Sequence, residues 1–99
     1  MKTESIINPP ESKVLKSGRV VLLPGESVGK HITEKKEELI IVLRGTATLS
    51  ENGKSIRLKT GETHYIKEDV PHNILNKSNQ KLEYIYIVGL LNQQDLSTY

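Results

Sequence analysis

Histidine and carboxylate side chains are the groups in this sequence whose types and spacing could do chemistry. The chain has three histidines, His31, His64 and His72, and no cysteine. The lack of cysteine excludes disulfides, thiolate zinc sites and cysteine nucleophiles, so a metal ion would have to be held by imidazole, carboxylate or hydroxyl groups. A Gly-rich phosphate loop and a GxSxG nucleophile elbow are also absent, which argues against covalent catalysis.

A first segment contains glycine, histidine and glutamate at a particular spacing. Five residues separate Gly25 from His31. One residue then separates His31 from Thr33, four separate Thr33 from Glu38, and six separate Glu38 from Gly45. The segment therefore brings two flanking glycines, one imidazole and one carboxylate into a short stretch of chain.

A second segment repeats this kind of spacing around another histidine. Five residues separate Gly61 from Lys67. Asp69, His72 and Asn76 then follow, separated from the preceding named residue by one, two and three residues. The chain thus has two spaced segments with one histidine each at a comparable place.

Together the two segments resemble the two motifs of the cupin family, G(X)5HXH(X)3–4E(X)6G and G(X)5PXG(X)2H(X)3N. The resemblance covers residues 25–45 and 61–76. It implies an all-β chain that folds into a small double-stranded β-helix, the jelly-roll or cupin barrel. It also implies a divalent metal site in the barrel, with His31, Glu38 and His72 as ligands.

Three positions depart from the family pattern. Thr33 stands in place of the second histidine, Lys67 in place of a proline and Asp69 in place of a glycine. Thr33 is a possible but poor ligand, because a hydroxyl binds these metals much less well than an imidazole does. His64 lies outside both motifs, two residues before Ile66, and could supply the missing nitrogen. We favour the alternative for His64, which is a hydrogen-bonded structural role.

Side-chain alternation along strands is compatible with such a site. It puts Glu38 on the same face as Ile40, and His72 on the same face as Ile74. A closed sheet could therefore aim His31, Glu38 and His72 at one interior point. An inward carboxylate would be costly to bury unpaired, which favours its use as a ligand. Two imidazoles and one carboxylate suit Fe, Mn, Ni or Zn and leave open positions for water and substrate.

The carboxylate has a second candidate in the neighbouring residue. Glu37 would take the place of Glu38 if the preceding turn were one residue shorter, but the distance to Gly45 favours Glu38. The motif glycines and Asn76 are expected to hold turns, the glycines at points that need a positive φ angle or a close approach of strands.

Short β-branched runs between Gly, Asn and Pro predict eight strands, as in a sandwich or barrel. The expected strands are Val20–Pro24, Val28–Thr33, Glu38–Arg44, Thr46–Glu51, Lys54–Lys59, Thr63–Lys67, Val70–Asn76 and Leu82–Leu90. Asn52-Gly53 predicts a type I′ hairpin between two of them. The run TEKKEELIIVLR could form a helix capped by Thr33. Because Leu39–Leu43 is an unbroken apolar run ended by Gly45, we predict a strand there, preceded by a polar turn.

The 99 residues predict a single barrel domain over residues 1–99, with residues 1–12 and 92–99 loosely held or forming edge strands. The net charge is only +2 and the basic residues are scattered, so no nucleic-acid partner is expected. Neither an apolar run long enough to cross a bilayer nor a secretory signal is present, which predicts no membrane partner and a cytoplasmic location.

Both faces of the last expected strand are largely apolar. Tyr84 and Tyr86 alternate there with Ile85 and Ile87, so each face carries two large side chains. A homodimer interface would explain this pattern, and so would simple packing. We expect a homodimer.

Three functions are compatible with these residues. The first is a metal-dependent enzyme, of the dioxygenase or isomerase type that the cupin resemblance implies. It would act on a small oxygen-bearing molecule in a barrel lined by Ile40, Val42, Ile66 and Ile74. The second is a binding protein that holds a metal or small ligand without turnover. The third is a metal-free barrel in which the same polar residues form a structural network.

Overall fold

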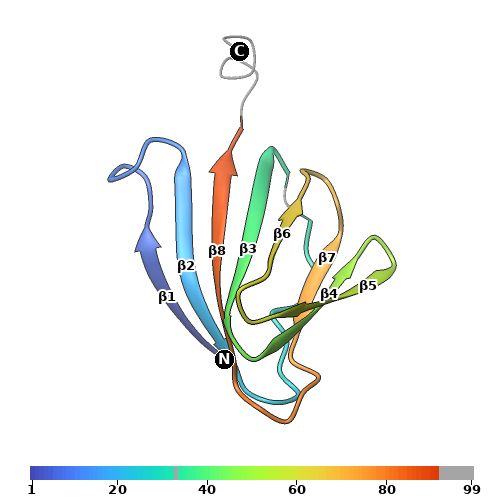
Figure 1. Cartoon of the computed structure of the whole chain (residues 1–99). Coiled ribbons are helices and arrows are strands. Elements are labelled where there is room, and N and C mark those ends of the chain that lie inside the picture. The colour runs from blue at the N-terminus through green and yellow to red at the C-terminus, as the bar shows by residue number, and fades with distance from the viewer. Residues whose placement is uncertain (33, 92–99) are drawn as a thin grey trace.

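The computed structural model describes residues 1–32 and 34–91, and this part of the chain forms eight strands and no helix (Figure 1). The strands are β1 (Lys2–Ile7), β2 (Leu15–Leu22), β3 (Lys36–Arg44), β4 (Thr46–Glu51), β5 (Lys54–Lys59), β6 (Thr63–Ile66), β7 (His72–Leu75) and β8 (Leu82–Leu90). They make two antiparallel sheets, one of five strands in the order β1-β2-β8-β3-β6 and one of three in the order β5-β4-β7.

The hydrophobic core lies between the two sheets and follows the alternation of each strand. Successive residues of β3 change from half-buried to buried, so Glu38, Ile40 and Val42 point inward while Leu39 and Ile41 point outward. Inward side chains from both sheets form one cluster: Val20, Leu22, Ile40, Val42, Ala47, Leu49, Leu58, Ile66, Ile74, Leu82 and Tyr84. The barrel interior is therefore solid over most of its length.

The β4–β5 hairpin has the geometry that the sequence predicts. Asn52 and Gly53 both have positive φ angles, 49° and 82°, as a type I′ turn requires. Glu51 pairs directly with Lys54 across the turn. The prediction of a type I′ hairpin is confirmed.

The segment expected as a strand at Val28–Thr33 is not one, and this prediction is wrong for its described residues. The segment makes only isolated bridges, Ser27 with Leu75 and His31 with His72 of β7. Gly29 has a φ of 101°, which interrupts the extended chain between the two bridges. The eighth strand is β1 instead, which pairs with β2 at the edge of the larger sheet.

The start of β3 also differs from the expectation. The strand begins at Lys36, and Glu34 and Lys35 are the residues of the preceding turn that the structure describes. Lys35 takes the positive φ angle of this turn, 54°. The strand interpretation of Leu39–Leu43 is confirmed, and the helical alternative is wrong.

Of the two ends of the chain, the structure describes the first. Residues 2–7 form the edge strand β1, whereas residues 92–99 lie outside the described residues. Nowhere in residues 1–32 and 34–91 is there a helix that is long and apolar enough to cross a membrane.

Candidate metal centre

The structure brings His31, Glu38 and His72 together at one end of the barrel. Each offers one ligand atom, and these three atoms lie within 4.8 Å of one another. His72 is the first residue of β7 and Glu38 lies in β3, so the two sheets supply one inward ligand each. His31 lies on the segment beside β7 and is exposed, whereas Glu38 and His72 are buried. The site is therefore closed on the core side and accessible from the side of His31.

A one-residue bulge places His31 opposite His72. Between the two bridges, the segment advances by four residues from Ser27 to His31, while β7 advances by only three, from Leu75 to His72. The positive φ of Gly29 accommodates the extra residue. The backbones of His31 and His72 then exchange two hydrogen bonds of 2.9 and 3.0 Å, and their rings lie 4.1 Å apart between centroids, at 66°.

Backbone carbonyls fix the protonated nitrogen of both histidines. Nδ1 of His72 lies 2.8 Å from the carbonyl oxygen of Val70, and Nδ1 of His31 lies 3.0 Å from that of Gly29. A carbonyl oxygen can only accept, so each Nδ1 carries the hydrogen and donates it. In the neutral rings, the lone pair is then on Nε2, which is how metal-binding histidines are commonly oriented.

The Nε2 atom of His72 is buried without a hydrogen-bond partner among the described residues. Its nearest polar neighbour is Oε1 of Glu38 at 3.4 Å, which forms an ion-pair contact but no hydrogen bond. Burying an unpartnered polar atom is costly, so a native site normally supplies a partner. A divalent ion bound by the three side chains would satisfy this atom, and the nitrogen and oxygen donors suit such an ion.

Opposing effects act on the pKa of His72. Burial by itself lowers this pKa, because it disfavours the charged imidazolium. The nearby Glu38 carboxylate and the Val70 carbonyl raise it, and the net result is a pKa above the ordinary value of 6.5. The Glu38 carboxylate therefore favours the charged form of His72 and offsets the effect of burial on this pKa.

Glu37 and His64, the two other polar candidates that the structure describes, do not join this group. Glu37 points outward, where it accepts a hydrogen bond of 2.8 Å from the hydroxyl of Tyr65. His64 faces inward on β6 but donates from Nε2 to the carboxylate of Glu51, at 3.1 Å. This bond agrees with the structural role favoured for His64. Thr33 lies outside the described residues.

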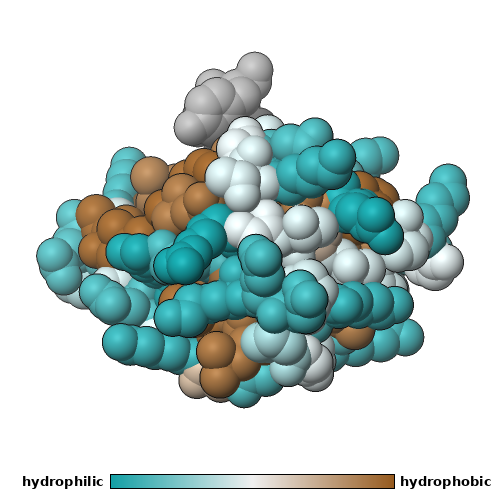
Figure 2. Space-filling model, turned by 60° about the horizontal axis from the view of Figure 1, so that its bottom comes forward, coloured by the Kyte–Doolittle hydropathy of each residue, from teal (hydrophilic) through white to brown (hydrophobic). Residues whose placement is uncertain are grey.

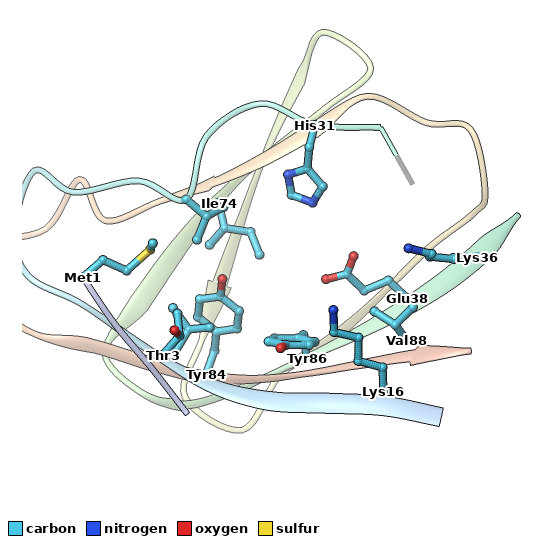
Figure 3. Close-up of a pocket in the computed structure, with 12 residues that line it drawn as sticks. Met1, Thr3, Lys16, His31, Lys36, Glu38, Ile74, Tyr84, Tyr86 and Val88 are labelled. Carbon is cyan, nitrogen blue, oxygen red and sulfur yellow. The ribbon is translucent and has the colours of Figure 1, made fainter. Parts of the chain in front are cut away.

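A cavity of about 290 Å³ adjoins the candidate metal centre (Figure 3). His31 and Glu38 form part of its wall, and the other lining residues are Met1, Thr3, Lys16, Val20, Val28, Lys36, Ile74, Tyr84, Tyr86 and Val88. The four apolar residues expected to line the barrel all face its interior, and Ile74 is the one of the four that borders this cavity. Ile40, Val42 and Ile66 are in the solid core instead, at 0–1% exposure.

Two tyrosines of β8 form much of the cavity floor. The ring of Tyr86 lies over Gly18 of β2, where an added Cβ would be 2.5 Å from the Tyr86 hydroxyl oxygen. Burial raises the pKa of Tyr84, and the Glu38 carboxylate raises it further, so its hydroxyl stays protonated and can donate a hydrogen bond. Sequence reasoning missed both tyrosines as wall residues, although their alternation with Ile85 and Ile87 places them on one face.

Lys16 and Lys36 are the two charged wall residues that the motifs did not indicate. Lys16 pairs with Val88 of β8, and Val88 pairs in turn with Glu38, so Lys16 and Glu38 lie on the same face with one strand between them. Lys36 lies two residues before Glu38 on β3 and therefore shares its face. The sequence could have indicated Lys36 as a wall residue, because alternation along the strand puts it on the same face as Glu38.

Comparison with known proteins places this geometry in a family. A profile of the cupin domain matches residues 18–88. The oxalate-binding protein of Thermotoga maritima is 34% identical over 73 residues, which are 74% of this chain and 60% of that protein. The tetracenomycin polyketide synthase protein TcmJ of Streptomyces glaucescens is 26% identical over 74 residues, 75% of this chain and 50% of that protein. The matched region thus spans less than two thirds of either relative.

The arrangement of the sheets agrees with this match. A crystal structure described as a predicted oxalate decarboxylase from Thermotoga maritima superimposes with a TM-score of 0.84 at 28% identity. The similarity covers 90% of this chain and 79% of that one, and it confirms the all-β double-stranded β-helix barrel. Since the family profile also covers most of the residues, the chain belongs to the cupin domain family.

Proposed function

We propose that this cupin binds a divalent metal ion through His31, Glu38 and His72 and holds a small oxygen-bearing molecule beside it. The observation that carries the proposal is the buried Nε2 of His72, which has no hydrogen-bond partner among the described residues and faces Glu38. The carbonyl contacts at Nδ1 of His31 and His72 support it, because they turn both Nε2 lone pairs toward the group. Fe, Mn, Ni and Zn are the ions that such a donor set favours.

In this proposal, the chain holds three metal-binding side chains in place beside a cavity that is open on one side. His31 is exposed, so a small molecule can approach the centre from its side. The bound ion would act as a Lewis acid or oxygen activator. The oxalate-binding relative is named for a small oxygen-rich ligand, which supports a molecule of this kind for the cavity.

Binding without turnover and metal-dependent catalysis share this site. If the protein is an enzyme, we propose a dioxygenase or an isomerase. A dioxygenase would consume oxygen together with its substrate, and an isomerase would rearrange its substrate. The name of the oxalate-binding relative favours the binding form. The metal-free alternative keeps His72 and Glu38 as an ion pair, but their 3.4 Å contact lacks hydrogen-bond geometry, which favours a metal.

The first experiment measures bound metal by elemental analysis after purification without chelators or a nickel column. We expect close to one divalent ion per chain, lost in His31→Ala and in His72→Ala because each variant removes one donor. His64→Ala is the matched control, since His64 pairs with Glu51 outside the group, and it should keep the ion. Circular dichroism shows whether each variant is folded.

Two results would contradict the proposal. One is a wild-type protein that contains no divalent ion and takes none up when it is supplied. The other is a folded His31→Ala variant that retains the ion in full. His31 is exposed, so its loss should disturb the core little and keep this second test informative.

We also propose that the protein forms a homodimer through the outer face of the larger sheet. Four half-buried aliphatic side chains occupy the middle of this face: Leu39, Ile41, Ile85 and Ile87. Tyr65 extends the row beside Leu39 and is 53% exposed. Figure 2 shows groups of apolar side chains among hydrophilic ones on the molecular surface. Covering such a face with a second copy would remove apolar area from water.

The cytoplasmic location stays a prediction from the sequence. Fractionation of cells, with detection of the protein by antibody, would test it. Recovery of the protein outside the cytoplasmic fraction would contradict it.

A further inference from the structure

Two lysine side chains extend into the cavity beside the candidate metal centre. Figure 3 shows the ammonium groups of Lys16 and Lys36 directed into the space that Glu38 and His31 border. Lys16 comes from β2 and Lys36 from β3, with β8 between the two strands. The cations therefore approach the cavity from strands on opposite sides of β8.

The backbone register explains why both lysines face the cavity. Lys16, Val88 and Glu38 form one row across β2, β8 and β3. Neighbouring strands are roughly 4.8 Å apart, so the backbones of Lys16 and Glu38 are about 10 Å apart. A lysine side chain can cover much of that distance, which brings its ammonium group near the metal ligands.

Neither lysine is neutralised by a carboxylate in the described part of the chain. The ion pairs there involve the N-terminal amine, Arg19, His64 and His72, and neither Lys16 nor Lys36. Glu38 supplies the only carboxylate among the wall residues that the structure describes. Two lysines and one glutamate give these side chains of the wall a net positive charge, which a divalent ion at Glu38 would increase.

The remaining polar groups of the wall can also donate hydrogen bonds. Tyr84 keeps its proton because burial raises its pKa, and its hydroxyl points into the cavity (Figure 3). Lys16 and Lys36 are donors only, with no lone pair to offer when charged. A wall with these donors and a positive charge matches a ligand that carries acceptor oxygens and negative charge.

The size and the apolar part of the wall limit this ligand further. The cavity volume of about 290 Å³ is just below the usual range for ligand sites, roughly 300–1,000 Å³. Val20, Val28, Ile74 and Val88 form its apolar surfaces. These features favour a compact molecule with a short carbon skeleton over a bulky polyanion.

We propose that the cavity selects a small carboxylate anion, with Lys16 and Lys36 as the residues that determine this charge preference. The inference rests on the proposed function, because the anion shares the cavity with the ion held by His31, Glu38 and His72. It goes further in naming the charge of the ligand and the two lysines that recognise it. Removing either lysine should weaken anion binding and leave the metal in place.

The test uses the 99-residue chain loaded with manganese and calorimetric titration with oxalate. Oxamide is the matched neutral probe, because it has the same skeleton and no charge. We expect oxalate to bind the wild type well and oxamide to bind at least about tenfold more weakly. Lys16→Gln and Lys36→Gln should each weaken oxalate binding about tenfold, the size of change that one lost charge contact of about 1.4 kcal/mol gives.

Lys59→Gln is the control variant. Lys59 is exposed at the end of β5 and contributes nothing to the cavity wall, but its replacement changes the net charge of the protein equally. This variant should bind oxalate like the wild type. Elemental analysis before and after titration should find the same manganese content in all four proteins.

Three outcomes separate the two proposals. Weaker oxalate binding in Lys16→Gln and Lys36→Gln, with full metal content and an unchanged control, supports the inference. Full metal content with equal oxalate binding in all variants, with no oxalate binding, or with equal binding of oxamide overturns it and leaves the proposed metal site standing. A wild type that takes up no manganese overturns both.

Discussion

The orientation of His72 depends on a turn residue that the family pattern does not contain. Asp69 stands where the pattern has glycine and adopts the left-handed conformation, with a φ of 62°. The turn leads to Val70, whose carbonyl accepts the Nδ1 hydrogen of His72 at 2.8 Å. Aspartate tolerates this conformation better than most residues, because its short polar side chain can bond locally. The substitution is therefore compatible with the same turn and the same imidazole orientation.

This turn gives a prediction at the scale of one residue. Asp69→Ala should lower the free energy of unfolding by about 1 kcal/mol, because alanine is strained at a positive φ angle. Asp69→Gly should not lower it, because glycine adopts this conformation freely. Urea unfolding of the two variants and the wild type measures the difference. Equal stability of the alanine and glycine variants would show that the turn does not need the left-handed conformation.

The motif glycines also adopt positive φ angles. Gly25, Gly45 and Gly61 have φ angles of 85–86°, which agrees with the expectation for these turns. At Gly45 a side chain is also excluded by space, since an added Cβ would be 2.5 Å from the carbonyl oxygen of Lys81. Asn76 holds the loop before β8, as expected, through bonds from its amide to the carbonyls of Leu22 and Gln80.

At the scale of elements, the bulge beside β7 determines where His31 points. Without the extra residue, alternation from the inward Val28 would put His31 on the outer face. The bulge reverses the alternation, and both Val28 and His31 line the cavity. Gly29 contributes its φ of 101°, its carbonyl to His31 and its amide to the side chain of Asn73. This one residue therefore links backbone geometry to the candidate metal centre.

Gly29→Ala should weaken metal binding as well as stability. Holding alanine at this φ would cost about 1–3 kcal/mol, so the segment is expected to shift and move His31 away from Glu38. Gly61→Ala is the control, because Gly61 also has a positive φ and open space around it but lies outside the centre. Thermal unfolding should show destabilisation in both variants, and manganese titration should show weaker binding only in Gly29→Ala. Equal metal affinity in both variants would contradict the role of the bulge.

At the scale of the whole molecule, the two faces of the larger sheet differ in composition and in what they contact. Its inner face carries Glu38, Lys16 and Lys36 around the cavity, as well as much of the core. Its outer face is aliphatic around Ile41 and Ile87. Because the two faces alternate residue by residue, a change on the outer face can be made without touching the cavity.

The proposed dimer can be tested on this basis. Light scattering after size-exclusion chromatography should give twice the mass of one chain for the wild type. Ile87→Lys should give the monomer, because it would put a charge in the middle of the apolar interface. Ser55→Lys, on an exposed position of β5, should remain a dimer. The metal content of Ile87→Lys should be unchanged, and a wild type that stays monomeric at high concentration would contradict the proposal.

Local features of the sequence determined the family, the hairpin and most strands. The spacing of the two motifs indicated a cupin, and Asn52-Gly53 indicated the turn, because spacing and φ preference are properties of adjacent residues. Thr46–Glu51, Lys54–Lys59 and Leu82–Leu90 have the expected bounds, since each is a periodic run between clear turn residues. The distance to Gly45 also favoured Glu38 over Glu37, and the structure places Glu38 with the histidines.

Other features were decided only by contacts between distant segments. The bulge that turns His31 inward exists because the chain pairs with β7, and alternation along one segment contains no information about a shifted register. The bond from His64 to Glu51 joins the two sheets, and Lys16 approaches the cavity because β2 pairs with β8. Pairing partners and the convergence of charges are set by the packed barrel, so the tertiary structure alone could reveal them.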